Sequence, residues 1–251
     1  MWSETLEYRE YRPPYLAWFF EAAAREIPLS GQEALLDLAC GTAPLALGFA
    51  PFVASVTGLD IELPMLEVAR ERARRAGVAI RLVHSKAEEA PEDLGRFHLI
   101  TIGMAHWFLH STATLARINR WLLPGGSVLL CRTVGFGPRD LPWHETFDAI
   151  RRRWQRGDLV SKLDLTWDNF FEGTDFAAGN KVIARGRRKI NLEHLVQRAL
   201  AYPTTSRAIL GAETEHMIAD IRAGMTPYFK DGPILEQLTV VGGLYRRRGD
   251  R

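Results

Sequence analysis

Apolar runs and helical stripes alternate along the chain and predict its elements. An apolar run over 34–38 ends in a turn of small residues and leads into a helix from Leu45. The stretch 64–76 carries apolar residues on one helical face and ends at Gly77, a residue type typical of helix C-termini. Further short strands are predicted at 55–60, 80–83, 97–102 and 127–133. Strands that alternate with helices at this spacing predict a doubly wound parallel α/β sheet.

The second half of the chain departs from this alternation. A helix that precedes the strand at 127–133 is marked by Leu115, Ile118 and Leu122. Residues 135–190 are then rich in aromatic side chains, and insertions at the carboxyl edge of a parallel sheet are placed to close a ligand pocket. We therefore expect an aromatic-rich helical cap there. A turn at 231–233 introduces a β-branched strand over 235–245.

Composition narrows the class of protein. The chain has 251 residues, of which 47% are hydrophobic and 25% charged, as expected of one globular domain. Its net charge of +2 requires no polyanionic partner. The two cysteines, Cys40 and Cys131, form neither a disulfide framework nor a zinc framework and suit a reducing compartment. Because the N-terminus carries no long apolar segment, we expect a cytoplasmic protein that neither is secreted nor spans a membrane.

The strand at 34–38, the turn after it and the following helix form a typical nucleotide-binding unit. Such a unit presents backbone N–H groups to a ligand. Asp60 ends the next strand some 20 residues further on, where a carboxylate can accept hydrogen bonds from both ribose hydroxyls of a nucleoside. Only Gly41 of the Gly-x-Gly-x-x-Gly fingerprint of dinucleotide-binding turns is present, and this turn has alanines at Ala39 and Ala43. Because alanine tolerates a positive φ poorly, this turn has either ordinary dihedral angles or strain.

These segments resemble the motifs of class I S-adenosylmethionine-dependent methyltransferases. Asp37 and Gly41 match the first motif, and Asp60 followed by a Met-Leu helix start is similar to the second. Residues 85–91 resemble the third motif, and Gly125-Gly126 resembles the turn before strand five. The resemblance covers residues 8–134 well and 209–247 more loosely.

The resemblance implies a seven-stranded, mostly parallel Rossmann-like sheet with an antiparallel closing strand. It implies one methyltransferase domain composed of an N-terminal arm and helix (1–30), a cofactor-binding core (31–134), the cap (135–190) and a C-terminal part (191–251). S-adenosylmethionine would be the methyl donor and S-adenosylhomocysteine the product. The arm at 8–15 is similar to one that folds over the cofactor in small-molecule methyltransferases.

Cofactor-binding residues are also implied by the resemblance. Asp60 would hold the ribose, Gly41 and Gly103 would approach the methionine part, and Ala87 and Glu88 would face the adenine. The full set of expected cofactor-binding residues is Tyr11, Asp37, Ala39, Gly41, Asp60, Ile61, Met65, Ala87, Glu88, Gly103 and Met104. No metal is expected.

The loop at 103–110 follows the fourth strand, where this fold usually meets its substrate. His106 and Trp107 lie one residue away from the His-Trp pair of many family members. His106 is either a base that takes a proton from the acceptor or a structural histidine bonded to a backbone carbonyl. His144 is a second catalytic candidate because it follows soon after strand five. Trp107, together with the aromatic rings of the arm, is expected to shield the sulfonium, and positioning is expected to supply most of the rate.

Two other functions remain open. Arginine clusters at 151–153, 185–189 and 246–248 would suit a nucleic-acid methyltransferase, but such short runs are more often solvated surface, and the loop after strand four lacks the Asn/Asp-Pro-Pro-Tyr sequence of base-amine methyltransferases. A non-methylating cofactor-binding scaffold or cyclase is the other alternative. We expect a small, planar or apolar acceptor, no nucleic acid, and a monomer or homodimer.

Overall fold

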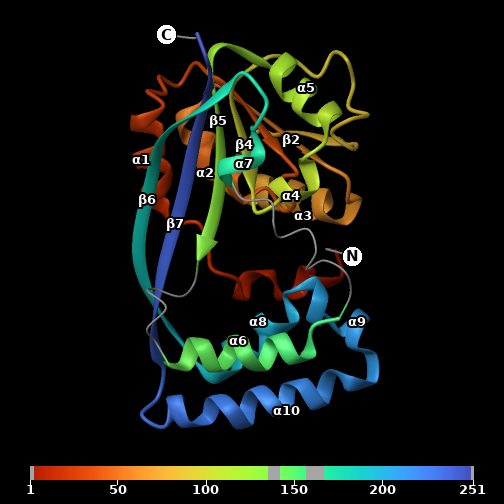
Figure 1. Cartoon of the computed structure of the whole chain (residues 1–251), viewed down its shortest axis with the longest axis vertical. Helices are drawn as coiled ribbons and strands as arrows, with labels where there is room; N and C mark the ends of the chain where they lie inside the picture. Colours follow the sequence, from red (N-terminus) through yellow and green to blue (C-terminus); the bar gives the residue numbers. More distant parts are fainter. Residues whose placement is uncertain (1–2, 135–141, 157–166, 250–251) are drawn as a thin grey trace. The chain divides into compact units, whose positions relative to one another are not determined.

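The computed structural model describes residues 3–134, 142–156 and 167–249, and the chain divides into two compact units (Figure 1). The unit that we call the sheet unit comprises Tyr15–Arg132, Lys162–Ala184 and Val240–Arg251. The helical unit comprises Met1–Pro14, Thr133–Ser161 and Arg185–Thr239. Within the expected cap, residues 135–141 and 157–166 lie outside the described residues.

The sheet has seven strands in the order β3-β2-β1-β4-β5-β7-β6. Their bounds are β1 (Ala34–Leu38), β2 (Ser55–Asp60), β3 (Arg81–His84), β4 (Phe97–Gly103), β5 (Leu122–Val134), β6 (Phe176–Ile190) and β7 (Ile234–Arg247). Strands β1 to β5 pair in parallel, whereas β7 runs antiparallel to β5 (Figure 1). The predicted doubly wound sheet with an antiparallel closing strand is confirmed.

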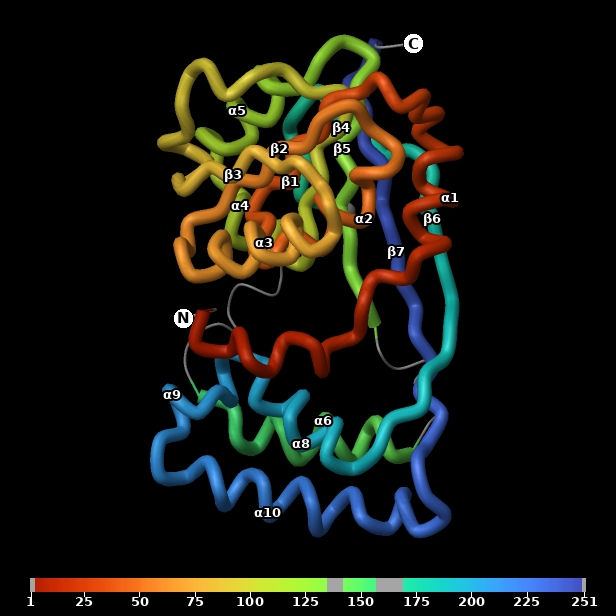
Figure 2. The backbone as a smooth tube through the Cα atoms, turned by 180° about the vertical axis from the view of Figure 1, so that it is seen from behind, coloured from red at the N-terminus to blue at the C-terminus, as the bar shows by residue number. Residues whose placement is uncertain are grey.

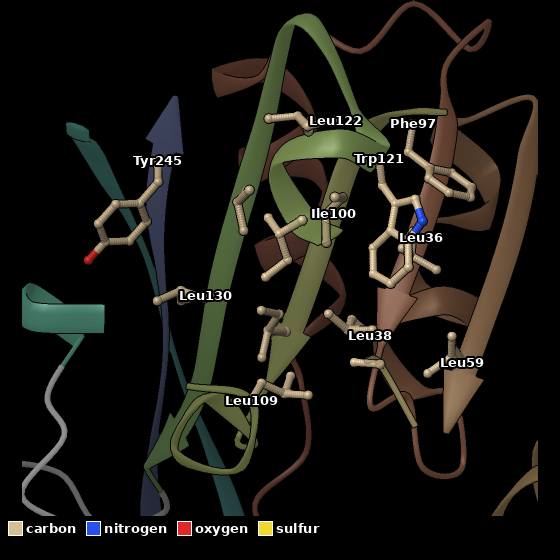
Figure 3. Packing of buried hydrophobic residues seen from close by; sticks show 14 of the residues in the cluster. Leu36, Leu38, Leu59, Phe97, Ile100, Leu109, Trp121, Leu122, Leu130 and Tyr245 are labelled. Carbon is tan, nitrogen blue, oxygen red and sulfur yellow. The ribbon is translucent and has the colours of Figure 1, made fainter. Parts of the chain in front are cut away.

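Both faces of the central strands are buried, as their continuous apolar sequences require. Leu36, Leu38 and Ile100 belong to one apolar cluster with Trp121, and Figure 3 shows their side chains between the strands and α5. Leu35 on β1, Leu99 on β4 and Leu129 on β5 alternate along their strands with the residues of this cluster, and they are also buried. Helices therefore have to cover both sides of the sheet.

The helices of the sheet unit are α1 (Ala17–Glu26), α2 (Pro44–Phe49), α3 (Leu63–Ala76), α4 (His106–Leu109), α5 (Thr112–Trp121) and α7 (Trp167–Phe170), with the 3-10 turn η2 (Ala50–Phe52). Gly77 ends α3 at φ 66°, as its sequence predicts. The prediction that Leu122 is helical is wrong. Leu122 is extended at ψ 129° and starts β5, since Pro124 two residues later cannot continue a helix.

The prediction of a helical cap over 135–190 is wrong for its last part, because Phe176–Ile190 forms the edge strand β6. The aromatic residues at the start of β6 and just before it do not form a hydrophobic core of their own. Phe170, Phe171 and Phe176 join the apolar cluster of the sheet, where the rings of Phe171 and Phe176 stack at 4.5 Å. Edge strands tolerate the glycines and charges that conceal β6 in the sequence.

The helical unit has its own apolar core. Its elements are η1 (Ser3–Tyr11), α6 (Pro142–Trp154), α8 (Leu192–Leu200), η4 (Pro203–Thr205), α9 (Arg207–Leu210), η5 (Gly211–Glu213), α10 (Thr214–Met225) and η6 (Thr226–Phe229). The arm η1 lies along α8, and α10 lies along α6 (Figures 1 and 2). Buried Phe147, Leu195 and Met217 are among the residues that these helices contribute to the core.

Candidate active site

The carboxyl ends of β1, β2 and β4 meet at one edge of the sheet. Leu38 pairs with Leu59 on one side and with Ile102 on the other. The next residue of each strand, Ala39, Asp60 and Gly103, therefore lies at the same edge. Three segments that the sequence separates by about 20 to 40 residues meet here, as ligand sites of open α/β sheets do.

The turn after β1 has a left-handed backbone at three positions. The φ angles are 56° at Ala39, 55° at Gly41 and 58° at Ala43. Of the two alternatives for this turn, strain is therefore the one observed, because alanine pays about 1–2 kcal/mol in this region. The Cys40 N–H donates to Leu59 O at 3.0 Å, and the Gly41 N–H donates to Asp60 Oδ2 at 2.7 Å. Strained residues held by such bonds are typical of functional turns.

Asp60 connects this turn to α3. Its Oδ2 accepts the Gly41 N–H, and its Oδ1 accepts the Glu62 N–H at 2.8 Å. A carboxylate oxygen can accept more than one hydrogen bond, so a ribose hydroxyl is a chemically suitable donor to this side chain. Ile61 follows with 55% of its surface exposed, whereas Met65 is buried inside the unit. A carboxylate beside an exposed apolar side chain fits a ribose joined to a flat base.

Asp37 lies beneath the turn and is buried. Its carboxylate accepts Thr101 Oγ1–H at 2.7 Å and the Ala46 N–H at 3.1 Å. Burial raises the pKa of Asp37 to about 7, although both hydrogen bonds oppose the rise. Asp37 therefore connects β1, β4 and α2 and supports the turn from inside.

The loop after β3 is bonded to the same edge. The Ser85 N–H donates to Asp60 O at 3.0 Å, and His84 Nε2 donates to Ile61 O at 2.9 Å. Ala87 is buried in the apolar cluster of the sheet. Glu88 Oε1 accepts two hydroxyl groups at the start of α5, and these bonds lower its pKa. The expected adenine-facing loop thus lies beside the expected ribose-binding carboxylate.

The loop after β4 carries the catalytic candidates of the sheet unit. Met104 has φ 54° and is 37% exposed, and its N–H donates to Cys131 O at 3.0 Å. His106 is buried, with the Trp107 ring edge-on at 4.6 Å and the Phe170 ring at 6.1 Å. Phe108, two residues on, is 39% exposed. This loop presents exposed apolar side chains around a histidine.

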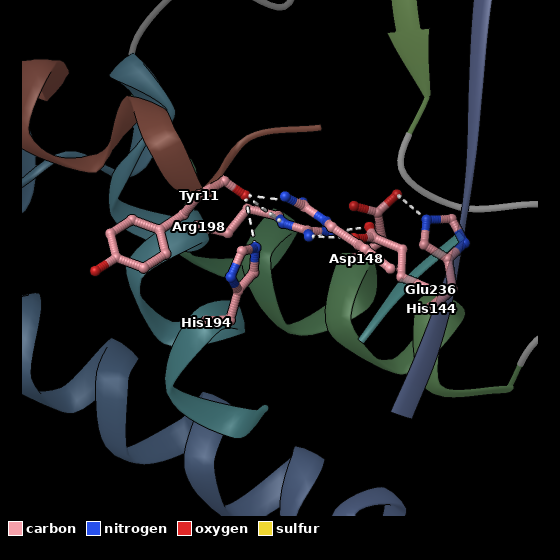
Figure 4. Close-up of polar contacts among 7 residues, drawn as sticks. Tyr11, His144, Asp148, His194, Arg198 and Glu236 are labelled. Carbon is pink, nitrogen blue, oxygen red and sulfur yellow. Dashed lines mark hydrogen bonds and ion pairs between the residues drawn. The ribbon is translucent and has the colours of Figure 1, made fainter. Parts of the chain in front are cut away.

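Two predicted site residues, Tyr11 and His144, belong to the helical unit. The Tyr11 carbonyl oxygen accepts hydrogen bonds from His194 Nε2 at 3.0 Å, Arg198 Nε at 3.1 Å and Arg188 Nη2 at 3.3 Å (Figure 4). The His194 ring meets the Tyr11 ring edge-on at 5.2 Å. Burial and the two guanidinium groups lower the pKa of His194 to about 4, so it is neutral at pH 7.

His144 lies on α6, where its Nε2 is 3.9 Å from Asp148 Oδ2 (Figure 4). Burial lowers its pKa, which keeps the ring neutral and able to accept a proton. Twelve of the fourteen predicted site residues thus lie in the sheet unit.

A buried ion pair in the helical unit was missed by the sequence analysis. Glu236 and Arg198 are both fully buried, with Oε1 and Nη1 2.6 Å apart, and Arg188 Nε is 2.5 Å from Glu236 Oε2. Arg188 belongs to one of the predicted surface clusters. Nothing in the periodicity of either segment signals the pairing, because the partners are 38 and 48 residues apart.

The other basic clusters also contain arginines bonded within the protein. Arg151 Nη2 pairs with Asp148 at 3.2 Å, and Arg246 Nε donates to Ser127 Oγ at 3.1 Å. Within the part of the chain that the structure describes, no group of three or more His, Cys, Asp or Glu residues is placed to hold a metal ion. No helix in that part has the length and apolar character needed to span a membrane.

Comparison with known proteins identifies the family. A protein-family model described as a methyltransferase domain matches residues 35–126. An uncharacterized methyltransferase of Mycobacterium tuberculosis is 31% identical over 144 residues, which cover 57% of this chain and 68% of that protein. A ubiquinone biosynthesis O-methyltransferase of Pseudomonas aeruginosa is 29% identical over 143 residues, 55% of this chain and 59% of that protein.

Solved structures share the fold. A SAM-dependent methyltransferase from Thiobacillus denitrificans, in complex with S-adenosyl-L-homocysteine, aligns over 94% of this chain and 93% of its own with a TM-score of 0.56 and 20% identity. A similar complex from Geobacter sulfurreducens aligns over 94% and 93% of the two chains with a TM-score of 0.55 and 17% identity. This chain belongs to the methyltransferase family, and it shares its fold with these two S-adenosylmethionine-dependent enzymes.

Proposed function

We propose that the enzyme methylates a hydroxyl group of a small, ring-bearing acceptor. The observation that carries this proposal is the juxtaposition, at one sheet edge, of Asp60 with a histidine surrounded by aromatic rings. Exposed Met104 and Phe108 supply apolar surface there. The O-methyltransferase relative named for ubiquinone biosynthesis, and a demethylmenaquinone methyltransferase of Thermus thermophilus that is 36% identical over 100 residues, support a ring-bearing acceptor.

We propose the following roles on the donor side. Asp60 accepts the ribose hydroxyls, Ile61 packs on the adenine, and the backbone around Ala39, Gly41 and Gly103 approaches the methionine part. Asp37 and Met65 act from beneath the loops, because their side chains are buried. Ala87, Glu88, Met104 and Tyr11 stay predictions as cofactor-binding residues.

Bound S-adenosylmethionine supplies a methyl group on a positively charged sulfur. We propose that His106 accepts the hydroxyl proton of the acceptor on a ring nitrogen and that Trp107 excludes water from it. His144 stays a prediction as a base. The protein forms no covalent bond with the acceptor, and most of the rate comes from its alignment with the donor.

The donor assignment predicts that Asp60→Ala weakens S-adenosylmethionine binding about tenfold or more in calorimetry, which corresponds to ~1.4 kcal/mol. The physical reason is the loss of the ribose acceptor together with the bond that holds the strained turn. Glu89→Ala is the control, since Glu89 pairs with Lys86 at the exposed surface. Equal affinity in Asp60→Ala and the parent protein would remove the assignment.

The acceptor class is tested by S-adenosylhomocysteine release with a panel of phenols and hydroquinones. We expect turnover of acceptors that carry a hydroxyl group on a ring. In the His106→Gln variant, kcat should fall about 100-fold or more while the variant keeps the fold of the parent protein. Turnover of RNA, together with binding that weakens steeply with salt, would favour a nucleic-acid acceptor instead. Tight cofactor binding without turnover across the panel would favour the non-methylating scaffold.

A further inference from the structure

Glu88 joins two loops that the sequence places 23 residues apart. Its Oε1 lies 2.8 Å from both Ser111 Oγ and Thr114 Oγ1, and each hydroxyl group donates to it. The Thr114 bond is the largest cause of the lowered pKa of Glu88, so the carboxylate is ionised at neutral pH. Hydrogen bonds to an ionised acceptor are the stronger kind.

The two hydroxyl groups lie at the start of α5. Ser111 is the N-cap residue of this helix and accepts the Thr114 N–H at 3.1 Å. Its own N–H donates to Leu109 O at 3.0 Å, and Leu109 is the last residue of the short helix that begins at His106. Ser111 therefore links α5 to the segment that carries the candidate base.

The other end of the link is the loop after β3. Ser85, three residues before Glu88, donates its N–H to Asp60 O. Ala87 and Leu109 are both buried in the apolar cluster of the sheet. The Glu88 carbonyl oxygen accepts Arg117 Nη2 of α5 at 3.2 Å. Side-chain bonds of Glu88 thus join the donor-side loop to the start of α5, and the bond from the Ser111 N–H to Leu109 O joins α5 to the His106 segment.

We propose that Glu88 is a positioning residue that couples cofactor binding beside Asp60 to the placement of His106. This inference rests on the proposed function, in which Asp60 holds the donor and His106 serves the acceptor. Glu88 acts through Ser111 and Thr114, so the cofactor affinity and the surroundings of His106 change together. The resemblance to the family implies a different role, direct contact between Glu88 and the adenine.

Thr114 separates these two roles. Its side chain is fully buried and bonded to Glu88, so Thr114→Val removes the bond with little change of shape and leaves any direct contact of Glu88 intact. Thr114→Ser keeps the hydroxyl group. Glu89→Ala is a matched control on the same loop, because Glu89 bonds to exposed Lys86.

The experiment measures S-adenosylhomocysteine affinity by calorimetry and the NMR shift of the His106 ring on adding it. We expect Thr114→Val to weaken binding about fivefold to tenfold and to reduce the His106 response, with Thr114→Ser close to the parent protein. Glu88→Ala should add little in the Thr114→Val background, because both substitutions remove one link. Glu89→Ala should change neither readout.

Parent-like binding and response in Thr114→Val would overturn the proposal, and weak binding of Glu88→Ala alone would then assign Glu88 to direct contact. Asp60→Ala separates this failure from that of the proposed function. If Asp60→Ala binds S-adenosylhomocysteine as the parent does, the donor site itself is wrong. If only Asp60→Ala binds weakly, the donor site stands and the coupling is wrong. Circular dichroism of each variant checks that the fold is retained.

Discussion

At the residue scale, the most perturbed carboxyl group beside the candidate site is Asp37. Two hydrogen bonds favour its ionised form, yet burial prevails and raises its pKa to about 7. The unfolded chain has a pKa near 3.8 at this residue. Because the folded pKa is the higher one, the fold favours the protonated acid, and this contribution to stability is complete below about pH 4 and is lost as pH rises to about 7.

Asp37→Asn is therefore expected to flatten the pH dependence of unfolding. Between pH 5 and pH 7 the parent protein should lose about 2 to 3 kcal/mol of unfolding free energy that the variant keeps, at 1.36 kcal/mol per pKa unit. Urea unfolding at both pH values measures the difference. An asparagine has a carbonyl for the Ala46 N–H and an amide group for Thr101. Parallel pH profiles for the two proteins would contradict the raised pKa.

At the element scale, the end of β4 is packed too tightly for a side chain at Gly103. A Cβ atom there would lie 2.7 Å from the Tyr15 hydroxyl oxygen and 2.8 Å from Leu45 Cδ1, both in the sheet unit. Because glycine has no side chain, the end of β4 can lie close to Leu45 of α2 and to Tyr15. The sequence presented Gly103 only as a candidate cofactor contact, and the structure adds a packing reason for it.

Gly103→Ala is expected to destabilise the protein by about 1–3 kcal/mol, because tight cores respond to an added methyl group by strain. Gly179→Ala on β6 is the control, since its Cβ would meet Leu244 O at an ordinary 3.5 Å. Chemical denaturation of both variants gives the comparison. Equal stability of the two would show that the residues around Gly103 relax without strain.

The same scale shows which elements were predictable. The helix that ends at Gly77 was found to within one residue, because its apolar stripe and its C-terminal glycine agree. The edge strand β6 was missed, because its glycines and charged residues do not alternate with apolar ones. Leu122 was assigned to a helix, although the proline two residues later ends helical structure first.

At the scale of the whole molecule, the chain forms two units, each with its own apolar cluster. The helical unit also contains the buried pair of Glu236 and Arg198, which holds the main chain of Tyr11 through Arg198. Removing one partner of such a pair leaves a buried charge without compensation. A local change here should therefore affect the helical unit first.

We expect Glu236→Gln to destabilise the helical unit by about 3–5 kcal/mol. Hydrogen exchange should show lost protection in α8 and retained protection in β1. Glu213→Gln is the control, because its pair with Arg156 is exposed and such pairs contribute about 1 kcal/mol or less. Equal loss of protection in α8 and β1 would mean that the units unfold together.

The sequence by itself determined the order of strands and helices in the first half of the chain and the family. These follow from local signals: apolar runs, a turn of small residues, an acid at the end of a strand. Tertiary structure alone decided which distant polar groups meet, such as Glu88 with Thr114 or Arg198 with Glu236. It also decided that Asp37 is buried and that the alanines of the turn are strained. The physical reason is that burial and pairing depend on neighbours brought together by folding, which no local period records.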